Sequence, residues 1–334
     1  MTVLFRSLRL AVAFTAINVV GRIKVNALVN RTMASKIPAF TLNTGQQIPC
    51  IGYGTWQAKD EELEKAVEAA LEAGYRHIDT AYVYENEKVI GKVLKRWFDD
   101  GKLKNFTTLR TFEIKLLQLD SFCRRRHFLV TKLPPTGNRP EGVSKYLKKS
   151  LENLQMDYVD LYLIHVPFAF KEVGENLHPT KADGTIDMDI TTDHVAIWKE
   201  MEKQMDAGLT RAIGVSNFNK TQMERILKNC RIQPSSLQIE LHVYFQQNEL
   251  VDLCKKHNIL VTAYSPLGSP GLAEMFAKIG RKFDLPDILG NPTVKAIGEK
   301  YSKSAAQVVL RFYIQRGNIT YSKKYKPWKI ETKS

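Results

Sequence analysis

The sequence predicts an α/β fold in which eight parallel strands alternate with helices and close into a (β/α)8 barrel. Short apolar runs of the kind that form buried strands recur along the chain, and amphipathic helical patterns occupy most of the gaps between them. This alternation runs too long for one half of a doubly wound sheet. A length of 334 residues also accommodates a barrel of roughly 250 residues in one domain.

The predicted elements follow the chain in order. Residues 39–49 contain two short strand patterns around an Asn-Thr-Gly turn, which predicts a β-hairpin ahead of the barrel. Apolar residues recur at helical spacing over residues 61–73 and again over residues 141–154. The barrel strands are predicted at residues 51–54, 77–79, 128–132, 159–165, 212–215, 237–240, 260–265 and 319–321.

Polar side chains capable of acid–base chemistry stand where three of these strands end. The strand over residues 77–79 ends on Asp79, and Tyr84 follows in the loop before the next helix. The next strand delivers Lys132, and the one after it delivers His165. The carboxyl ends of parallel barrel strands share one rim, so these four side chains predict a proton-transfer site there.

The net charge of +14 is concentrated outside the body of the predicted barrel. Residues 1–38, 101–127 and 321–334 carry +6, +5 and +4, which leaves −1 for the rest of the chain. A nucleic-acid-binding face gathers basic side chains on a folded surface, so this distribution argues against a nucleic-acid partner. No window reaches the roughly 18 to 20 apolar residues of a membrane span, so no membrane partner is expected.

Cysteine usage and the N-terminal segment bear on the compartment of the protein. Cys50, Cys123, Cys230 and Cys254 have neither metal-ligand spacing nor the pattern of a disulfide framework. Free thiols in a reducing compartment predict a cytoplasmic protein without a metal site. Residues 1–33 are basic and free of acidic side chains. We interpret them as an extension ahead of a working start, with a mitochondrial-type presequence or a signal-like segment as the alternatives.

Six phrases along the chain resemble, in order, those of the aldo-keto reductase family, and the aldose and aldehyde reductases in particular. One such phrase is weak evidence, whereas six in order over residues 37–320 are specific. The resemblance implies a TIM barrel that carries an oxidoreductase site. The phrases are Gly74-Tyr-Arg-His-Ile-Asp79-Thr-Ala with Tyr84-x-Asn-Glu, Thr131-Lys132, Leu163-Ile-His165-x-Pro, Gly214-Val-Ser-Asn-Phe218, Gln238-Ile-Glu and Ala263-Tyr-Ser-Pro-Leu-Gly-Ser-Pro270.

The chain departs from the family in two segments. Relatives pass almost directly from a phrase like Asp100-Gly-Lys-Leu-Lys104 into the next strand, so residues 101–127 are interpreted as an insertion, with unspliced intron sequence as one source. After the last strand the family continues with Ile-Pro-Lys-Ser, an arginine and a final helix, which residues 323–334 do not match. We expect a barrel over residues 34–322 whose last helix is missing, followed by a divergent basic tail.

The family's chemistry is hydride transfer to a carbonyl carbon, which leaves an oxygen that needs a proton. A free tyrosine is a weak acid at neutral pH, and a nearby ammonium lowers its pKa. The resemblance makes Tyr84 the proton donor, with Lys132 as the ammonium beside it. Asp79 is then the ion-pair partner of the lysine, and His165 is a neutral hydrogen-bond donor to the carbonyl. Singly, each has a structural alternative, such as a helix cap for Asp79 or a core histidine for His165; together they favour catalysis.

The cofactor implied by the resemblance is NADP(H), held without a Rossmann loop. Gly52-Tyr-Gly54 is not followed by a third glycine, so no dinucleotide-binding loop is predicted. The Ile-Pro-Lys-Ser lysine that clamps the 2′-phosphate in relatives is not matched here. The resemblance assigns Tyr264 to stacking on the nicotinamide, Ser216, Asn217 and Gln238 to its carboxamide, Thr55 and Trp56 to the ribose and substrate, and Ser265, Leu267 and Ser269 to the pyrophosphate, with Asp79 also counted in the cofactor site.

The substrate pocket is predicted from fewer residues. Trp56, Val83, Val166 and Phe168 form an apolar wall beside His165, and many aldose-reducing relatives have a tryptophan where Val166 stands, so this pocket is expected to be wider. The expected function is NADPH-dependent reduction of aldehydes and ketones, with a small carbonyl compound as substrate and a monomer as the working form. The alternative is a non-catalytic or mis-spliced member of the family that binds cofactor weakly or not at all.

Overall fold

The computed structural model describes residues 37–103, 127–269, 271–272, 276–277, 280, 282 and 285–322. The predicted extension over residues 1–33 and the predicted tail over residues 323–334 lie outside these described residues. Residues 104–126 of the predicted insertion lie outside them as well. The division of the chain into these parts therefore stays a prediction.

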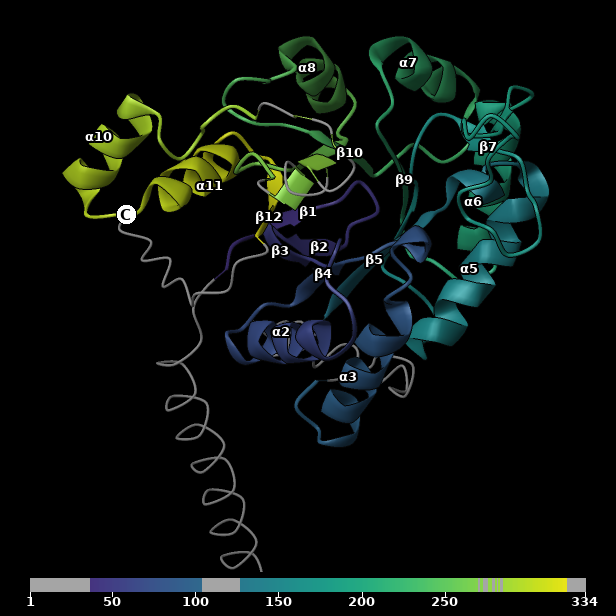
Figure 1. Ribbon diagram of the computed structural model, residues 1–334, viewed down its shortest axis with the longest axis horizontal. Coiled ribbons are helices and arrows are strands. Elements are labelled where there is room, and N and C mark those ends of the chain that lie inside the picture. Colours follow the sequence, from purple (N-terminus) through teal and green to yellow (C-terminus); the bar gives the residue numbers. More distant parts are fainter. Residues whose placement is uncertain are drawn as a thin grey trace, which may run out of the picture. The chain divides into compact units, whose positions relative to one another are not determined.

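Eight parallel strands close into a barrel, in which each strand pairs with the next barrel strand along the chain and β12 pairs with β3. Helices lie outside this ring of strands (Figure 1). This is the predicted (β/α)8 fold, in which helical crossovers connect parallel neighbours. The strands are β3 (Ile51–Gly54), β4 (His77–Asp79), β5 (Phe128–Leu133), β6 (Leu161–Ile164), β9 (Ile213–Ser216), β10 (Ser236–Glu240), β11 (Leu260–Tyr264) and β12 (Ile319–Ser322).

The predicted strand limits agree closely with the structure. β3 and β4 begin and end where the sequence pattern predicts. β6 is the largest departure, because it is shorter at both ends than the predicted strand over residues 159–165. Val159 forms only an isolated bridge with Thr210, and His165 lies just beyond the end of the strand. The strand therefore stops immediately before the predicted site residue.

The starts of several helices follow from local sequence. Pro140 and Pro292 lie in the first turns of α5 and α10, where a missing N–H breaks no helical hydrogen bond. Asn219 and Ser304 form capping boxes at α7 and α11. β12 ends at the last described residue, so the predicted absence of a final helix lies outside the described residues. The helices are α2 (Asp60–Glu72), α3 (Glu87–Asp99), α5 (Pro140–Leu154), α6 (His194–Asp206), α7 (Lys220–Asn229), α8 (Asn248–Lys256), α10 (Pro292–Tyr301) and α11 (Ala305–Gln315).

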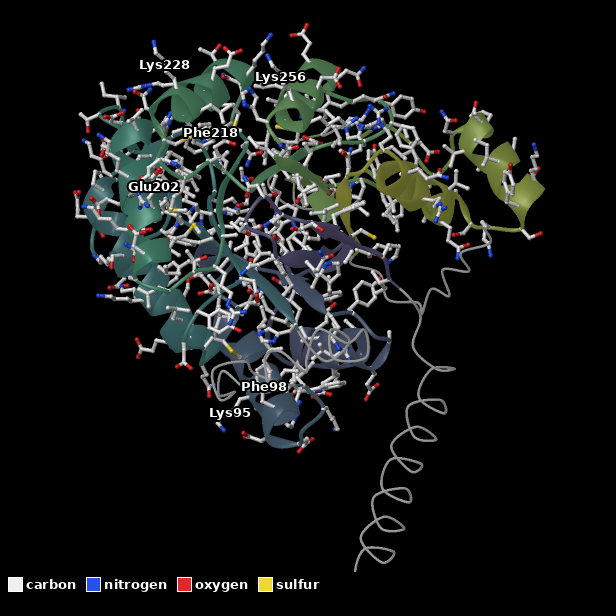
Figure 2. All side chains as sticks on the ribbon, turned by 180° about the vertical axis from the view of Figure 1, so that it is seen from behind. Lys95, Phe98, Glu202, Phe218, Lys228 and Lys256 are labelled. Atoms are coloured by element: carbon white, nitrogen blue, oxygen red, sulfur yellow. The ribbon has the colours of Figure 1, made fainter. Side chains whose placement is uncertain are left out.

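The helices bury apolar stripes and turn charged side chains outward. In α2, Leu63, Val67 and Leu71 are buried, and burial of each such side chain contributes about 1.5–3 kcal/mol. Lys228 and Lys256 extend from the outer sides of α7 and α8 (Figure 2). In the part of the chain that the structure describes, no helix combines the length and apolar character needed to span a membrane.

A β-hairpin closes the amino-terminal end of the barrel, as predicted. β1 (Ala39–Thr41) and β2 (Gln47–Pro49) pair antiparallel, and Leu42 and Ile48 are buried. These two side chains pack against residues near the beginnings of the barrel strands, so the barrel has an apolar floor. The other members of this cluster are Phe128, Val130, Leu161, Leu163, Ala212 and Ile319, with Phe40 and Leu260 packed against it.

The alternation of side chains along a strand explains why polar groups stand above this floor. Phe128 and Val130 belong to the floor cluster, so Lys132, two residues further along β5, faces the same interior. The same step leads from Leu163 in β6 to His165. The apolar floor and the polar rim are therefore built from the same strands.

Short elements near the polar rim are absent from the sequence predictions. η2 (Tyr82–Tyr84) and η5 (Pro135–Gly137) are single 3₁₀ turns, and β7 (Ala169–Phe170) pairs antiparallel with β8 (Met188–Asp189). These elements of two or three residues lie inside loops and carry neither an apolar run nor a turn motif that would mark them in the sequence. η2 matters most for function because it ends on Tyr84.

His77 lies inside the barrel and makes stability depend on pH. Its Nδ1 is 3.0 Å from the Pro49 carbonyl oxygen, while its Nε2 has no hydrogen-bond partner among the described residues. Burial lowers the pKa of His77 from 6.5 to about 4. Between these values the unfolded chain binds a proton that the folded chain rejects. The free energy of unfolding therefore falls as the pH falls below 6.5 toward about 4.

We expect a His77→Gln variant to lose less stability than the wild type between neutral pH and about pH 5, by up to about 1.4 kcal/mol per pH unit. Urea unfolding followed by circular dichroism at both pH values measures this difference. His178→Gln, at an exposed histidine, is the matched control and should parallel the wild type. Parallel pH dependences for His77→Gln and the wild type would contradict a buried, neutral His77.

Candidate active site

The four predicted acid–base side chains meet at the carboxyl rim of the barrel. Asp79 is the last residue of β4 and Tyr84 the last of η2. Lys132 is the next-to-last residue of β5, and His165 directly follows β6. Lys132 Nζ is 2.6 Å from Asp79 Oδ1 and 3.4 Å from the Tyr84 hydroxyl oxygen. The ring centroids of Tyr84 and His165 are 5.6 Å apart. Side chains from four separate segments thus form one cluster.

Lys132 is a fully buried ammonium with three oxygen acceptors around it. Besides Asp79 and Tyr84, the Thr80 carbonyl oxygen accepts a hydrogen bond of 2.8 Å from Lys132 Nζ. Burial alone would lower the pKa of Lys132, but the Asp79 carboxylate raises it, and the net result is a pKa above the ordinary 10.5. The lysine therefore stays charged at working pH, as predicted, because its three donors are matched by three acceptors.

Asp79 is held by donors on both carboxylate oxygens. Lys132 donates to Oδ1, while Gln238 Nε2 and the Tyr321 hydroxyl donate to Oδ2 at 2.9 and 3.0 Å. Its main-chain carbonyl also accepts from the Thr55 N–H and hydroxyl at 3.0 Å. Asp79 therefore fixes the lysine and links it to β10, β12 and the loop after β3. The alternative role as a helix cap does not apply, since its carboxylate is occupied by these side chains.

The pKa of Tyr84 differs from the sequence-based expectation. Burial raises it above the ordinary 10, the Lys132 charge lowers it, and the Asp79 charge raises it again. The predicted effect of Lys132 has the right sign, but the prediction of a net lowering is wrong. The loss of hydration destabilises the phenolate more than the Lys132 ammonium stabilises it, because the Asp79 carboxylate offsets part of the lysine's charge. The phenol therefore keeps its proton at neutral pH.

His165 is neutral, as predicted. Burial, followed by the Lys132 charge, lowers its pKa from 6.5 to about 3. Its Nδ1 is buried and has no hydrogen-bond partner among the described residues. Its main-chain carbonyl accepts a hydrogen bond of 2.9 Å from Asn217 Nδ2. The residue thus presents an uncharged imidazole beside Tyr84.

Asn217 joins two segments predicted to hold a nicotinamide, those of β9 and β11, to the segment of His165. It follows β9 with φ +64°, a backbone conformation that asparagine tolerates better than most residues. Its Nδ2 lies 3.1 Å from Ser216 Oγ and also donates to the His165 carbonyl, while its Oδ1 accepts from the Tyr264 hydroxyl at 2.8 Å. The side chains of β9 and β11 are thereby fixed relative to His165.

The remaining predicted cofactor residues lie on or beside the same rim. Gln238 is buried in the middle of β10, and Thr55 is buried directly after β3. Trp56 and Leu267 are half-buried. After β11, Ser265 and Ser269 adopt positive φ, and their hydroxyls are hydrogen-bonded to each other. The structure thus places this set at the carboxyl ends of β3, β9 and β11 and in the middle of β10.

Asn86 is a rim residue that the sequence reasoning did not single out. Its Nδ2 donates to the carbonyls of Thr55 and Ala58 at 2.9 and 3.0 Å, and its Oδ1 accepts from Thr80 Oγ1 at 3.0 Å. It therefore ties the loop after β3 to the loop that carries Tyr84. The available signal was its place in the quoted Tyr84-x-Asn-Glu phrase.

The predicted substrate wall lies on loops around His165. Trp56, Val83 and Val166 are half-buried, and Phe168 is 41 % exposed. Asn138, which the sequence reasoning also missed, donates to the carbonyl oxygens of residues 166 and 168 at 2.9 Å each. The segment that follows His165 is therefore anchored to the turn after β5.

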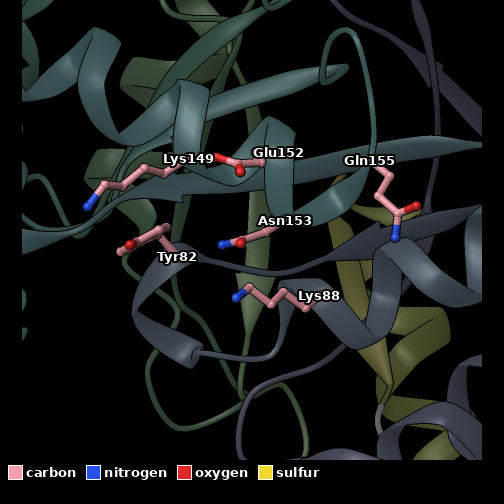
Figure 3. Close-up of a pocket in the computed structure, with 6 residues that line it drawn as sticks. All are labelled: Tyr82, Lys88, Lys149, Glu152, Asn153 and Gln155. Atoms are coloured by element: carbon pink, nitrogen blue, oxygen red, sulfur yellow. The ribbon is translucent and has the colours of Figure 1, made fainter.

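A surface hollow of about 440 Å³ lies apart from this cluster. Residues of η2, α3 and α5 line it, including Tyr82, Lys88, Lys149 and Asn153 (Figure 3). Lys149 is already paired with Glu175 at 2.9 Å. The hollow contains none of the four clustered acid–base residues, so it is not the candidate site. Among the described residues there is also no grouping of His, Cys, Asp and Glu suited to a metal ion.

Comparison with known proteins gives a consistent result. Residues 50–326 match the Aldo/keto reductase family. The chain is 40% identical over 298 residues to aldo-keto reductase family 1 member A1 of Xenopus tropicalis, covering 89% of this chain and 83% of the relative. It is 41% identical over 289 residues to the human protein of that name, covering 86% and 81%.

Two further relatives widen the comparison. The chain is 40% identical over 295 residues to dihydrodiol dehydrogenase 3 of Bos taurus, covering 87% of this chain and 83% of the relative. The solved structure of the aldose reductase from Schistosoma japonicum is similar to it with a TM-score of 0.72 and 36% identity, covering 88% of this chain and 86% of that one.

Proposed function

The chain belongs to the aldo/keto reductase family, and from this premise we propose that it reduces aldehydes and ketones to alcohols with NADPH. Family membership and the likeness to an aldose reductase support carbonyl reduction by an oxidoreductase. The observation that carries the finer proposal is the contact of the Tyr84 hydroxyl with the buried ion pair of Lys132 and Asp79.

Tyr84 is the proposed proton donor. NADPH, when bound, would supply a hydride to the carbonyl carbon. The Tyr84 hydroxyl is the group placed to give its proton to the carbonyl oxygen, which gains negative charge in that transfer. Lys132, 3.4 Å from that hydroxyl, stabilises the phenolate left behind. Water then returns a proton to Tyr84. Because the pKa of Tyr84 is raised above 10, the donor is in its protonated form throughout the neutral range.

Asp79 and His165 support this transfer in different ways. Asp79 keeps Lys132 charged in a buried position, where a lone lysine would favour its neutral form. His165 is proposed to orient the carbonyl. A neutral imidazole has one N–H, and placing it on Nε2 avoids an unpaired N–H at the buried Nδ1. Nε2 can then donate to a carbonyl oxygen.

The predicted cofactor residues fit a nicotinamide group. Gln238 uses both hydrogens of its amide within the protein, so its Oε1 is the atom left to accept a hydrogen bond among the described residues. Ser216 and Asn217 are proposed to share the carboxamide, and Tyr264 to stack on the ring. Thr55, Trp56, Ser265, Leu267 and Ser269 are proposed to hold the rest of the cofactor, and NADPH rather than NADH is proposed from the family alone.

The remaining proposals concern the substrate and the setting of the reaction. An apolar wall of Trp56, Val83, Val166 and Phe168 suits aromatic or aliphatic aldehydes, and the exposure of Phe168 supports contact with a small molecule. We propose a monomer that acts in the cytoplasm, with mitochondrial import as the alternative role of residues 1–33. The near-neutral barrel body supports a protein without a nucleic-acid partner.

The test is oxidation of NADPH in the presence of an aromatic aldehyde, followed by the loss of cofactor absorbance. We expect turnover that requires the aldehyde and prefers NADPH to NADH. A variant in which a family-like helix is added after β12 distinguishes a mis-spliced enzyme from a non-catalytic family member. Turnover by that variant alone would indicate a mis-spliced product, whereas cofactor binding without turnover by both would indicate a non-catalytic family member.

A further inference from the structure

Tyr321 occupies a close-fitting position in the barrel interior. Its ring lies edge-on to His77 with centroids 5.3 Å apart, and only 8 % of its surface is exposed. A Cβ at position 52 would come within 2.8 Å of the Tyr321 ring, so Gly52 is what leaves room for it. Packing therefore holds the ring independently of the hydroxyl group.

The Tyr321 hydroxyl forms a closed triangle of hydrogen bonds with Asp79 and Gln238. It donates to Asp79 Oδ2 at 3.0 Å and accepts from Gln238 Nε2 at 2.9 Å. Gln238 Nε2 donates its second hydrogen to the same Oδ2 at 2.9 Å. A carboxylate only accepts hydrogen bonds, so the amide nitrogen of Gln238 and not its oxygen must face Asp79.

We propose that Tyr321 is a positioning residue that orients the Gln238 amide toward the nicotinamide carboxamide and steadies Asp79 for Lys132. This inference rests on the proposed function, in which the carboxamide lies against Gln238. With its nitrogen committed to Asp79 and Tyr321, Gln238 presents Oε1, an acceptor, and the carboxamide NH2 is a donor. Loss of the Tyr321 hydroxyl removes one of the two contacts that prevent the amide from rotating.

Tyr321 is not placed to donate a proton itself. Its hydroxyl is turned toward Asp79 and is buried, whereas half-buried Tyr84 lies beside the His165 ring. Burial and then the Asp79 charge raise the pKa of Tyr321 well above 10, so its hydroxyl remains a hydrogen-bond donor at working pH.

The test compares cofactor affinity in the wild type and a Tyr321→Phe variant, which keeps the packed ring and removes the hydroxyl. Tryptophan fluorescence quenching gives Kd for NADPH and for its 3-acetylpyridine analogue, in which a methyl group replaces the carboxamide NH2. We expect Kd for NADPH to rise about tenfold in the variant and Kd for the analogue to change less than about twofold. A general structural defect would raise Kd for NADPH and for the analogue to the same extent.

Tyr313→Phe is the matched control. Tyr313 is also buried, but its hydroxyl has no hydrogen-bond partner among the described residues, so both Kd values should stay at wild-type levels. A Gln238→Met variant removes the amide that Tyr321 is proposed to orient. It should lose affinity for NADPH and not for the analogue. Adding Tyr321→Phe to this variant should cause no further loss of affinity. An unchanged Kd for NADPH in Tyr321→Phe, or equal losses for both cofactors, would overturn the inference.

Failure of the proposed function is seen separately from failure of this inference. NADPH binding without aldehyde turnover by the wild type would overturn the reductase proposal, while the ratio of Kd values would still decide the role of Tyr321. Absence of NADPH binding by the wild type would overturn both.

Discussion

A Tyr84→Phe variant is expected to lower kcat for aldehyde reduction by about 10²–10⁴-fold, the usual contribution of a general acid. The substitution removes the hydroxyl that lies 3.4 Å from Lys132 Nζ and leaves the ring beside His165. Cofactor contacts are untouched, so Kd for NADPH should stay within about twofold of the wild type. Steady-state kinetics and a fluorescence titration measure the two quantities on the same preparation.

Tyr82→Phe provides the control for this experiment. Tyr82 belongs to the same 3₁₀ turn, and its ring packs edge-on against Tyr146, away from the acid–base cluster. Its variant should retain the wild-type kcat. Turnover at the wild-type rate by Tyr84→Phe would show that another group supplies the proton, and the proposed mechanism would then be wrong.

A Lys132→Met variant is expected to lose turnover and about 3–5 kcal/mol of the free energy of unfolding. The side chain of Lys132 is 0% exposed and that of Asp79 is 6% exposed. Removing the ammonium therefore leaves a carboxylate buried with no opposite charge beside it. Urea unfolding at neutral pH measures the loss of stability, and the aldehyde assay measures the loss of activity.

A double variant, Asp79→Asn with Lys132→Met, should recover part of the stability lost by Lys132→Met, since it leaves no unpaired charge inside the barrel. Lys92→Met breaks an ion pair with Glu64 in which the lysine side chain is 63% exposed. That control should change stability far less than Lys132→Met does, because solvent screens the pair. If Lys132→Met were as stable as this control, the buried ion pair would not have the assigned energetic role.

The barrel and the acid–base cluster could be predicted from the sequence because their signals are local. Each barrel strand is a short apolar run, and period-two alternation places Lys132 above Phe128 and Val130 on one interior face. His165 needed one correction, since it follows β6 instead of ending it. Asp79, Tyr84 and Lys132 were still identified correctly as its neighbours, because parallel strands present their carboxyl ends at one rim.

The parts that the sequence did not reveal depend on contacts between distant segments. Asn86 and Asn138 stabilise rim loops by donating hydrogen bonds to carbonyl groups that are distant in the sequence. Neither residue's place in the sequence indicates these partners. Tyr321 belongs to none of the six family phrases, so no motif marked its contact with Asp79. The net pKa of Tyr84 was missed for a related reason, because desolvation depends on the folded surroundings and not on the nearest charge alone.

The apolar floor has a consequence for how this protein tolerates change in length. Phe128, the first residue of β5, packs in the floor and pairs in register with His77. These contacts of Phe128 fix the position of Lys132, which lies four residues further along β5, independently of the chain that precedes the strand. A change in the length of the stretch between residues 103 and 127 therefore leaves the position of the Lys132 ammonium in the barrel unchanged.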